Sequence, residues 1–253
     1  MSRHQRGVLH LAVGSDVGLR RERNEDSVYV SPRLLAVADG MGGHAHGEVA
    51  SAIAVAALAE LDRDLPADGD PRGGLLAAVA AIAGTLDEQV RQDEDFAGMG
   101  TTLTALLRQG DRFIGAHIGD SRAYLLRSGT LRQLTTDHTW VRSLVAEGRL
   151  TEAQIATHPR RSMLMRALQG GGTAQPDIFE WRIRQGDRYL LCSDGLTDYV
   201  PTAAVHEVLR AEQDPELAVR GLIDLAVGSG GQDNVTCVVA DVGRRVRRGW
   251  PRR

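Results

Sequence analysis

The sequence contains no lysine: its 30 strongly basic residues are all arginine, which excludes enzymes that use a lysine amine as nucleophile or Schiff base. Only two cysteines occur, Cys192 and Cys237, and both lie within apolar runs. This placement indicates buried, reduced thiols and excludes a framework of disulfides. No apolar run approaches the length of a membrane span, and the N-terminal segment turns polar too early for a signal peptide. We therefore expect a cytoplasmic protein without a membrane-spanning segment.

The composition is that of an ordinary globular protein. Of the 253 residues, 42% are hydrophobic and 25% are charged, which excludes collagenous, disordered and membrane-embedded chains. The length suits one large α/β domain or two small ones. The formal net charge of -3 produces no basic field, so nucleic acid is not expected as the main partner.

Periodicity predicts sheets covered by helices. Short apolar or β-branched runs predict strands at residues 8–13, 27–30 and 34–39. Two alanine-rich segments predict helices over 48–65 and 75–92, and four further runs, joined by short turns, predict an antiparallel meander over 101–135. Residues 139–168 are helical but interrupted by glycine and proline, as expected of an irregular surface insert. Beyond them we expect strands over 178–183, 188–193 and 234–242, and helices over 203–211 and 215–227.

Aspartates flanked by glycine or asparagine recur where apolar strands end or begin. The four cases are Asp39, Asp120, Asp194 and Asp233. One such junction is only a turn signal. Four can converge at one rim of a sheet, where carboxylates that lie close together must be neutralised by protons or cations. Oxygen ligands without a His and Cys cluster favour Mg²⁺ or Mn²⁺ over Zn²⁺.

Two neighbouring features strengthen this hypothesis. Gly40 follows Asp39, and a residue without Cβ lets its backbone carbonyl approach a cation, although a hairpin turn would also explain it. The run RRERNEDS carries Arg21, Glu25 and Asp26 just before a strand. An arginine fork can bind phosphate oxygens, and the two acids can hold metal-bound waters. A solvated surface of self-paired charges is the alternative interpretation.

Seven motifs occur in order over about residues 9–242: SDVGLRRERNEDS, ADGMGGHAHGEVAS, GMGTTLTALL, HIGDSRAYLLR, HPRRSMLMRAL, LLCSDGLTDYV and GGQDNVTCVV. This series resembles the metal-dependent protein serine/threonine phosphatases of the PP2C (PPM) family, above all the bacterial members that oppose Hanks-type kinases. The resemblance implies an α+β fold, a four-layer α-β-β-α sandwich in which helix pairs flank two antiparallel sheets. It also implies one phosphatase domain over 1–243, with a flap insert at 139–168 and a basic, solvated tail at 244–253.

The resemblance further implies roles for individual residues. Asp39 would bridge two Mn²⁺ or Mg²⁺ ions, Gly40 would bind through its carbonyl, and Asp194 and Asp233 would complete the core ligands. Asp120, together with Asp194, would hold a third, weaker ion. Arg21 would bind the substrate phosphate, while Glu25 and Asp26 would act through metal-bound waters. The catalytic set is therefore expected to be Arg21, Asp39, Asp194 and Asp233.

The activity implied is hydrolysis of phosphoserine and phosphothreonine by a water that bridges two metal ions and attacks phosphorus directly. The expected partners are phosphorylated proteins, including Ser/Thr kinases, and we expect a monomer. Met41 stands where eukaryotic members carry a histidine that protonates the leaving group, so the general acid is either a water on the third ion or His44. On the flap, His158, Arg160, Arg161 and Ser162 are expected to contact the substrate and gate access.

Two alternatives remain open at this stage. The same fold can hydrolyse another phosphate ester, because a fold does not determine its substrate. The chain can also be a pseudophosphatase that serves as a binding module. Loss of a core aspartate would favour the second alternative, but Asp39, Asp194 and Asp233 are all present.

Overall fold

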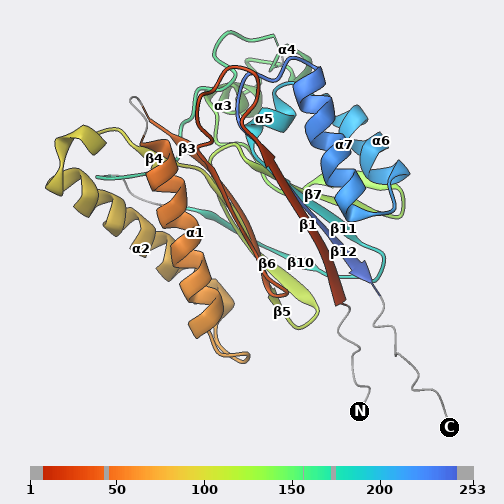
Figure 1. Ribbon diagram of the computed structural model, residues 1–253, viewed down its shortest axis with the longest axis horizontal. Coiled ribbons are helices and arrows are strands. Elements are labelled where there is room, and N and C mark those ends of the chain that lie inside the picture. The colour runs from red at the N-terminus through yellow and green to blue at the C-terminus, as the bar shows by residue number, and fades with distance from the viewer. Residues whose placement is uncertain (1–7, 43–45, 156, 172–174, 244–253) are drawn as a thin grey trace.

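Two antiparallel sheets pack face to face between two layers of helices in the computed structural model, which describes residues 8–42, 46–155, 157–171 and 175–243. Figure 1 shows α1 (Gly47–Asp64) and α2 (Pro71–Gln92) on one outer face, and α6 (Thr202–Ala211) and α7 (Pro215–Gly228) on the other. The expected four-layer α-β-β-α sandwich is confirmed.

Each sheet combines strands that are distant in the sequence. The first contains, in spatial order, β1 (Val8–Asp16), β12 (Val235–Gly243), β11 (Arg188–Cys192), β7 (Arg122–Arg127) and β8 (Thr130–Gln133). The second contains β10 (Asp177–Arg182), β6 (Arg112–Ile118), β5 (Leu103–Gln109), β3 (Leu34–Met41), β4 (Gly100–Thr101) and β9 (Leu168–Gln169), and β2 (Asp26–Val30) pairs with β3.

The continuous apolar runs of the central strands are explained by burial on both faces. In β3, Leu34 and Ala36 pack among residues of α1 and α2, whereas Leu35 and Val37 pack between the sheets. In β12 the same alternation sends Val239 toward the core under α6 and α7 and Val238 toward the inter-sheet core. Because side chains point to opposite faces at successive positions, each of these strands contributes both to the core between the sheets and to the core under its own pair of helices.

The outer helices form where the periodicity predicts them, except that α2 starts earlier than expected. In α2 the buried side chains recur at helical spacing: Leu75, Ala78, Val79, Ile82 and Leu86. This helix was expected to start at residue 75, but it starts at Pro71. The Asp70 carboxylate accepts a hydrogen bond from Arg72 N at 3.0 Å, and proline is well suited to the first helical position. The residues before position 75, which were expected to separate the two helices, therefore contain the start of α2.

The predicted meander over residues 101–135 is wrong. β5 and β6 pair in one sheet, whereas β7 and β8 pair in the other. The chain crosses between the sheets at residues 119–121. Gly119 has a φ of 107°, and a Cβ there would lie 2.6 Å from Thr102 Cβ. Glycine permits this backbone conformation, so the turn leads the chain across the sandwich rather than back along the same sheet.

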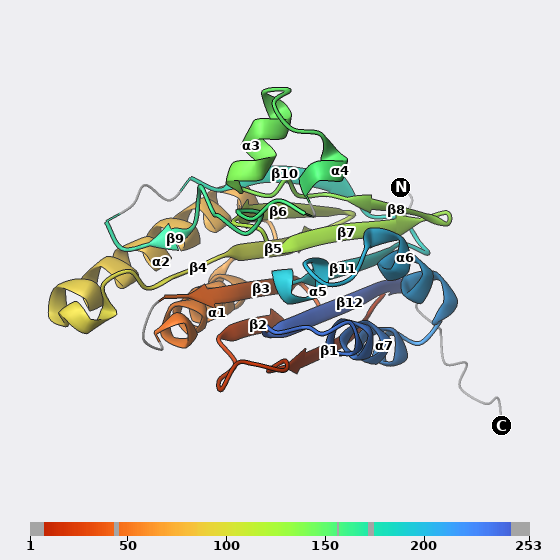
Figure 2. The same cartoon turned by 90° about the horizontal axis from the view of Figure 1, so that it is seen from above.

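The segment 139–168 is irregular, as expected, and contains the short helices α3 (Trp140–Ala146) and α4 (Glu152–Ile155). Figure 2 shows both helices standing together outside the sandwich. Two further short helices were not predicted: η1 (Glu94–Phe96) and α5 (Asp194–Thr197). Among the helices in the described part of the chain, none is long and apolar enough to span a membrane.

Candidate active site

Three strand ends and the sheet-crossing turn meet at one end of the sandwich. Asp39 lies near the end of β3, Asp194 follows β11, Asp233 precedes β12 and Asp120 lies in the 119–121 turn. A cavity of about 340 Å³ opens between them, which we call the acidic cavity. Its lining includes seven of the eight predicted site residues: Arg21, Glu25, Asp39, Gly40, Asp120, Asp194 and Asp233. The eighth, Asp26, pairs with Asp39 across β2 and β3.

The carboxylates of this cavity repel one another. Desolvation raises the pKa of Asp39 well above its usual value, and the negative charges of Asp26 and Asp194 raise it further. The pKa of Asp194 is also raised well above its usual range, first by desolvation and then by the charges of Asp120 and Asp198. Carboxylates brought together in this way are neutralised by protons or by cations.

Asp120 and Asp26 show the same effect. Desolvation is the main cause that raises the pKa of Asp120 to about 7, and it raises the pKa of Asp26 to about 6. Asp26 Oδ2 accepts a hydrogen bond from Ser193 Oγ at 2.7 Å. Asp26 Oδ1 is buried without a hydrogen-bond partner, and such an atom suits a nearby water or ion.

Gly40 is required by close backbone packing. A Cβ at this position would lie 2.2 Å from Gly47 O and 2.5 Å from Glu25 O. Gly40 N also donates to Glu25 O at 3.1 Å. Because no side chain fits here, the main chain of Gly40 itself lines the acidic cavity.

The residues of the acidic cavity fit a hard divalent cation, such as Mg²⁺ or Mn²⁺, that keeps several water molecules among its ligands. Within the described residues, no three His, Cys, Asp or Glu side chains alone are arranged to hold one ion. Mg²⁺ in proteins is commonly bound by one or two carboxylates together with water. Carboxylates, the nearby main chain of Gly40 and water form a donor set of this type.

Arg21 pairs mainly with Asp233 of the acidic cavity and more distantly with Glu25 of its own segment. Its Nε lies 2.8 Å from Asp233 Oδ1, and its Nη2 donates to Asp233 Oδ2 at 2.9 Å. Its Nη1 lies 3.8 Å from Glu25 Oε2. The hydrogen bond with Asp233 is the main cause that raises the pKa of Arg21. The self-paired surface proposed as the alternative interpretation does not describe this arginine.

The sequence prediction missed Asn234, which fastens the Arg21 segment to the start of β12. Its side chain accepts from Glu25 N at 2.8 Å and donates to Val17 O and Arg23 O, both at 2.9 Å. Asn234 is 4% exposed. The motif GQDNVT contains it, but no local periodicity indicates which segment a buried asparagine will bind.

Asp198 is a second missed residue. Its negative charge raises the pKa of Asp120 and of Asp194, so it lies within reach of the same cavity. It occupies the fourth position after Asp194, a spacing that places both residues on one side of a helical turn. The spacing of the two aspartates in the motif DGLTD was therefore the sequence signal that could have identified Asp198.

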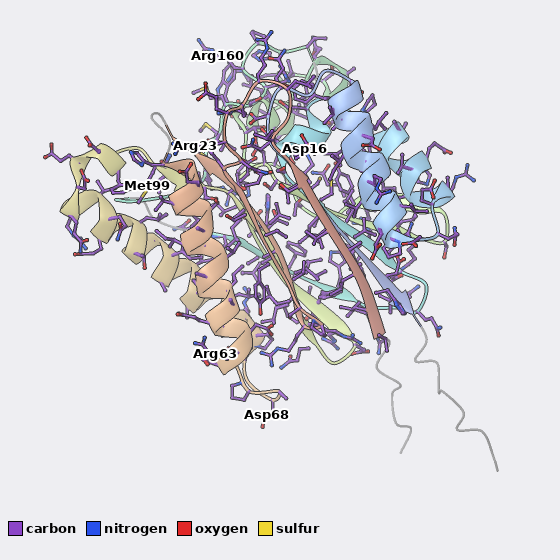
Figure 3. All side chains as sticks on the ribbon, in the orientation of Figure 1. Asp16, Arg23, Arg63, Asp68, Met99 and Arg160 are labelled. Atoms are coloured by element: carbon purple, nitrogen blue, oxygen red, sulfur yellow. The ribbon has the colours of Figure 1, made fainter. Side chains whose placement is uncertain are left out.

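The 139–168 segment reaches the cavity through part of its predicted set. Arg161 Nη2 lies 3.3 Å from Asp198 Oδ2, and Ser162 Oγ donates to the same oxygen at 3.0 Å. His158 and Arg160 pack instead against the ring of Trp140, at 5.4 Å and 5.5 Å. Figure 3 labels Arg160 at the extremity of this end, with Asp68 at the opposite end of the molecule.

Met41 also lines the acidic cavity, so the residue that replaces the histidine of eukaryotic members does lie at the site. His44, considered above as a general acid, lies outside the described residues, as does the basic tail at 244–253.

Comparison with known proteins agrees with this geometry. A family model described as protein phosphatase 2C matches residues 20–218. The serine/threonine protein phosphatase PstP of Mycobacterium tuberculosis is 54% identical over 235 residues, which are 93% of this chain. The chain spans only 45% of the length of that protein. The serine/threonine phosphatase Stp of Listeria welshimeri is 34% identical over 92% of this chain and 96% of its own length.

Solved structures give the same result. A crystal structure of the M. tuberculosis phosphatase PstP matches with a TM-score of 0.90 and 52% identity, and covers 94% of this chain and 100% of its own. The PstP catalytic domain in complex with two manganese ions matches with a TM-score of 0.87 and 51% identity, over 93% and 99% of the two chains. By its sequence, its fold and the residues that meet in the acidic cavity, this chain belongs to the protein phosphatase 2C family.

Proposed function

We propose that this protein is a metal-dependent phosphatase that hydrolyses phosphoserine and phosphothreonine in proteins. The observation that carries the proposal is the meeting of four strand-end aspartates with an arginine fork in one cavity. The manganese ions in the PstP catalytic domain support Mn²⁺ as a cofactor. Asp39, Gly40, Asp194 and Asp233 would hold two core ions, and Asp120 with Asp194 would hold a third.

Two bound ions would supply an activated water and neutralise charge on the transferred phosphoryl group. Arg21 presents two nitrogens to a carboxylate in this structure, and the same fork can bind two phosphate oxygens. Glu25, which lines the acidic cavity, and Asp26, which pairs with Asp39 across β2 and β3, would orient water there. Met41 has no transferable proton, so a water held near Asp120 by the third ion would give its proton to the leaving alkoxide and remain as hydroxide.

The substrates would be phosphorylated proteins, including Ser/Thr kinases, and the protein would act as a monomer in the cytoplasm. Its relatives are named serine/threonine phosphatases, and its two free, buried cysteines suit a reducing compartment. The phosphatase domain would extend over 1–243. Residues 139–168 would form a flap, because Ser162 and Leu164 line the acidic cavity.

Phosphate release from a phosphothreonine peptide, measured with Mn²⁺, with Mg²⁺ and with EDTA, tests the proposal. Asp194→Asn should abolish turnover. Asp224→Asn, which changes an exposed carboxylate on α7, is the matched control and should leave turnover unchanged. A protein that binds Mn²⁺ but releases no phosphate from phosphopeptides would contradict the proposal. Turnover of nucleotides or sugar phosphates under the same conditions would then identify a different phosphate ester.

A further inference from the structure

His138 holds the sheet-crossing turn at two points. Its backbone N donates to Gly119 O at 2.7 Å, and its ring Nδ1 accepts from Gly119 N at 3.2 Å. One residue thus satisfies both polar backbone groups of Gly119. The side chain of His138 is 3% exposed, so water does not readily replace either bond.

The tautomer of His138 follows from these contacts. Because Nδ1 accepts a hydrogen bond, the ring proton lies on Nε2, which donates to Asp177 Oδ2 at 3.2 Å. Asp177 is held in turn by Arg166 Nη1 at 2.9 Å. A carboxylate that orients a histidine in this way keeps the ring in one tautomer and one position.

The position of Gly119 determines where Asp120 lies. Gly119 adopts a φ of 107°, and Thr102 closes the space where a side chain would be. Asp120 follows directly and is only 8% exposed. On its other side, Ser121 Oγ is hydrogen-bonded to Thr102 Oγ1 at 2.7 Å. With both neighbours held, the main chain of Asp120 cannot shift without breaking one of these bonds, and its position determines where the carboxylate can reach.

His138 also contacts the segment that borders the cavity. Its carbonyl accepts from Met165 N at 2.7 Å, and its neighbour Thr139 forms a β-bridge with Leu164. Leu164 lines the acidic cavity. His138 therefore lies between the 119–121 turn and residues 164–165 of the 139–168 segment, and it is hydrogen-bonded to Gly119 and to Met165.

We propose that His138 is a positioning residue: its Nδ1 holds Gly119 so that Asp120 points into the acidic cavity and can bind the third, weakest cation. This inference rests on the proposed function, because that function assigns Asp120 to the cation. His138 does not line the acidic cavity, so it would touch neither the cation nor the substrate. It acts through the main chain of Gly119.

Two substitutions of His138 separate its two ring contacts. His138→Asn can place the amide Oδ1 where Nδ1 lies and keep the acceptor for Gly119 N, although it loses the contact with Asp177. His138→Gln can place its amide nitrogen near the position of Nε2 and keep the donor to Asp177, although it loses the acceptor for Gly119. A general loss of packing would affect both variants alike.

Calorimetric titration of the whole protein with Mn²⁺ tests the inference. The binding site that is lost in the Asp120→Asn variant is the one that Asp120 holds, and we expect it to be the weakest of the three. His138→Gln should weaken that site by about 10-fold or more, as loss of a partner behind a metal ligand typically does, whereas His138→Asn should remain within about 3-fold of the parent. The affinity of the two stronger sites should not change. With phosphopeptide, His138→Gln should need more Mn²⁺ to reach half its maximal rate, and His138→Asn should not.

Asp177→Ala provides a second route if His138→Gln fails to fold. Its side chain is 47% exposed, and its removal frees the histidine ring without opening the core. We expect a smaller loss at the same weak site. Equal effects of His138→Asn and His138→Gln, or an unchanged weak site in a folded His138→Gln, would overturn the inference. An Asp120→Asn variant that binds every ion as before would overturn it too, whereas metal-dependent turnover of phosphopeptides by that variant would leave the proposed function standing.

Discussion

Arg21 binds both carboxylate oxygens of Asp233, although 212 positions separate the two residues in the chain. The pairing places a two-point donor at the edge of the acidic cavity. A cation bound by Asp233 would compete with Arg21 for these oxygens and leave the guanidinium free to receive a phosphate.

Substitution of Arg21 should therefore weaken substrate binding. For Arg21→Ala we expect KM for a phosphopeptide to rise by about 10-fold or more, because a charge-assisted pair with the phosphate is lost. Arg21→Lys should recover only part of the loss, since an ammonium group cannot make the two-point contact. Arg23→Ala is the control, because Arg23 is exposed and pairs with Glu48 at 3.0 Å. Unchanged KM and kcat in Arg21→Ala would remove its assigned role.

Gly40 should tolerate no side chain. In Gly40→Ala the new Cβ would meet Gly47 O at 2.2 Å, so the backbone must shift at a cost of about 1–3 kcal/mol in the free energy of unfolding. Turnover should fall as well, because the shifted main chain lines the cavity. Gly84→Ala, within α2 and with nothing within 4 Å of the new Cβ, should instead raise stability by up to about 1 kcal/mol. Urea unfolding of both variants measures this contrast.

The metal-free protein should become less stable as the pH rises from about 5 to about 8. The folded-state pKa of Asp26 is raised to about 6 and that of Asp120 to about 7. At pH values between the unfolded-state and the folded-state pKa values of these two carboxyl groups, the folded protein therefore binds more protons than the unfolded chain. This stabilisation is fully present below the unfolded pKa, near 4, and is lost as the pH rises through the folded values.

Thermal unfolding in EDTA across this pH range measures the effect. Saturating Mn²⁺ should reverse the trend, because the cation replaces the protons on the carboxylates and binds more tightly as they ionise. A melting temperature that rises with pH in EDTA would contradict the assignment of raised pKa values to these two carboxyl groups.

The two thiols should be inert in the folded protein. Cys192 and Cys237 face each other across β11 and β12, and both are fully buried. Desolvation raises the pKa of Cys192 to about 12 and that of Cys237 well above its usual value. Since the thiolate is the reactive form, a colorimetric disulfide reagent should detect neither thiol at neutral pH and both after unfolding. Rapid reaction without unfolding would show that the β11–β12 pair opens locally.

Local patterns in the sequence determined the layers of this protein. The central parts of β3, β11 and β12, at residues 34–38, 190–192 and 237–240, contain no polar side chain for an exposed face, so these strands had to be buried on both sides. The Ala-rich segments with an apolar stripe had to cover a sheet. The aspartates came at strand ends because Asp and Gly disfavour strand interiors. These local preferences predicted sheets covered by helices and aspartates gathered at one rim, whereas the four-layer order and the full set of site residues were implied by the family resemblance.

Tertiary structure alone decided which strands share a sheet and which residues support the site. The short turns between consecutive strands predicted a meander, but Gly119 sends β7 into the opposite sheet. Asn234 and His138 act through hydrogen bonds to backbone groups far away in the chain. A buried asparagine or histidine has no periodicity that names its partner, because the partner is chosen when the two sheets pack and bring their main chains together.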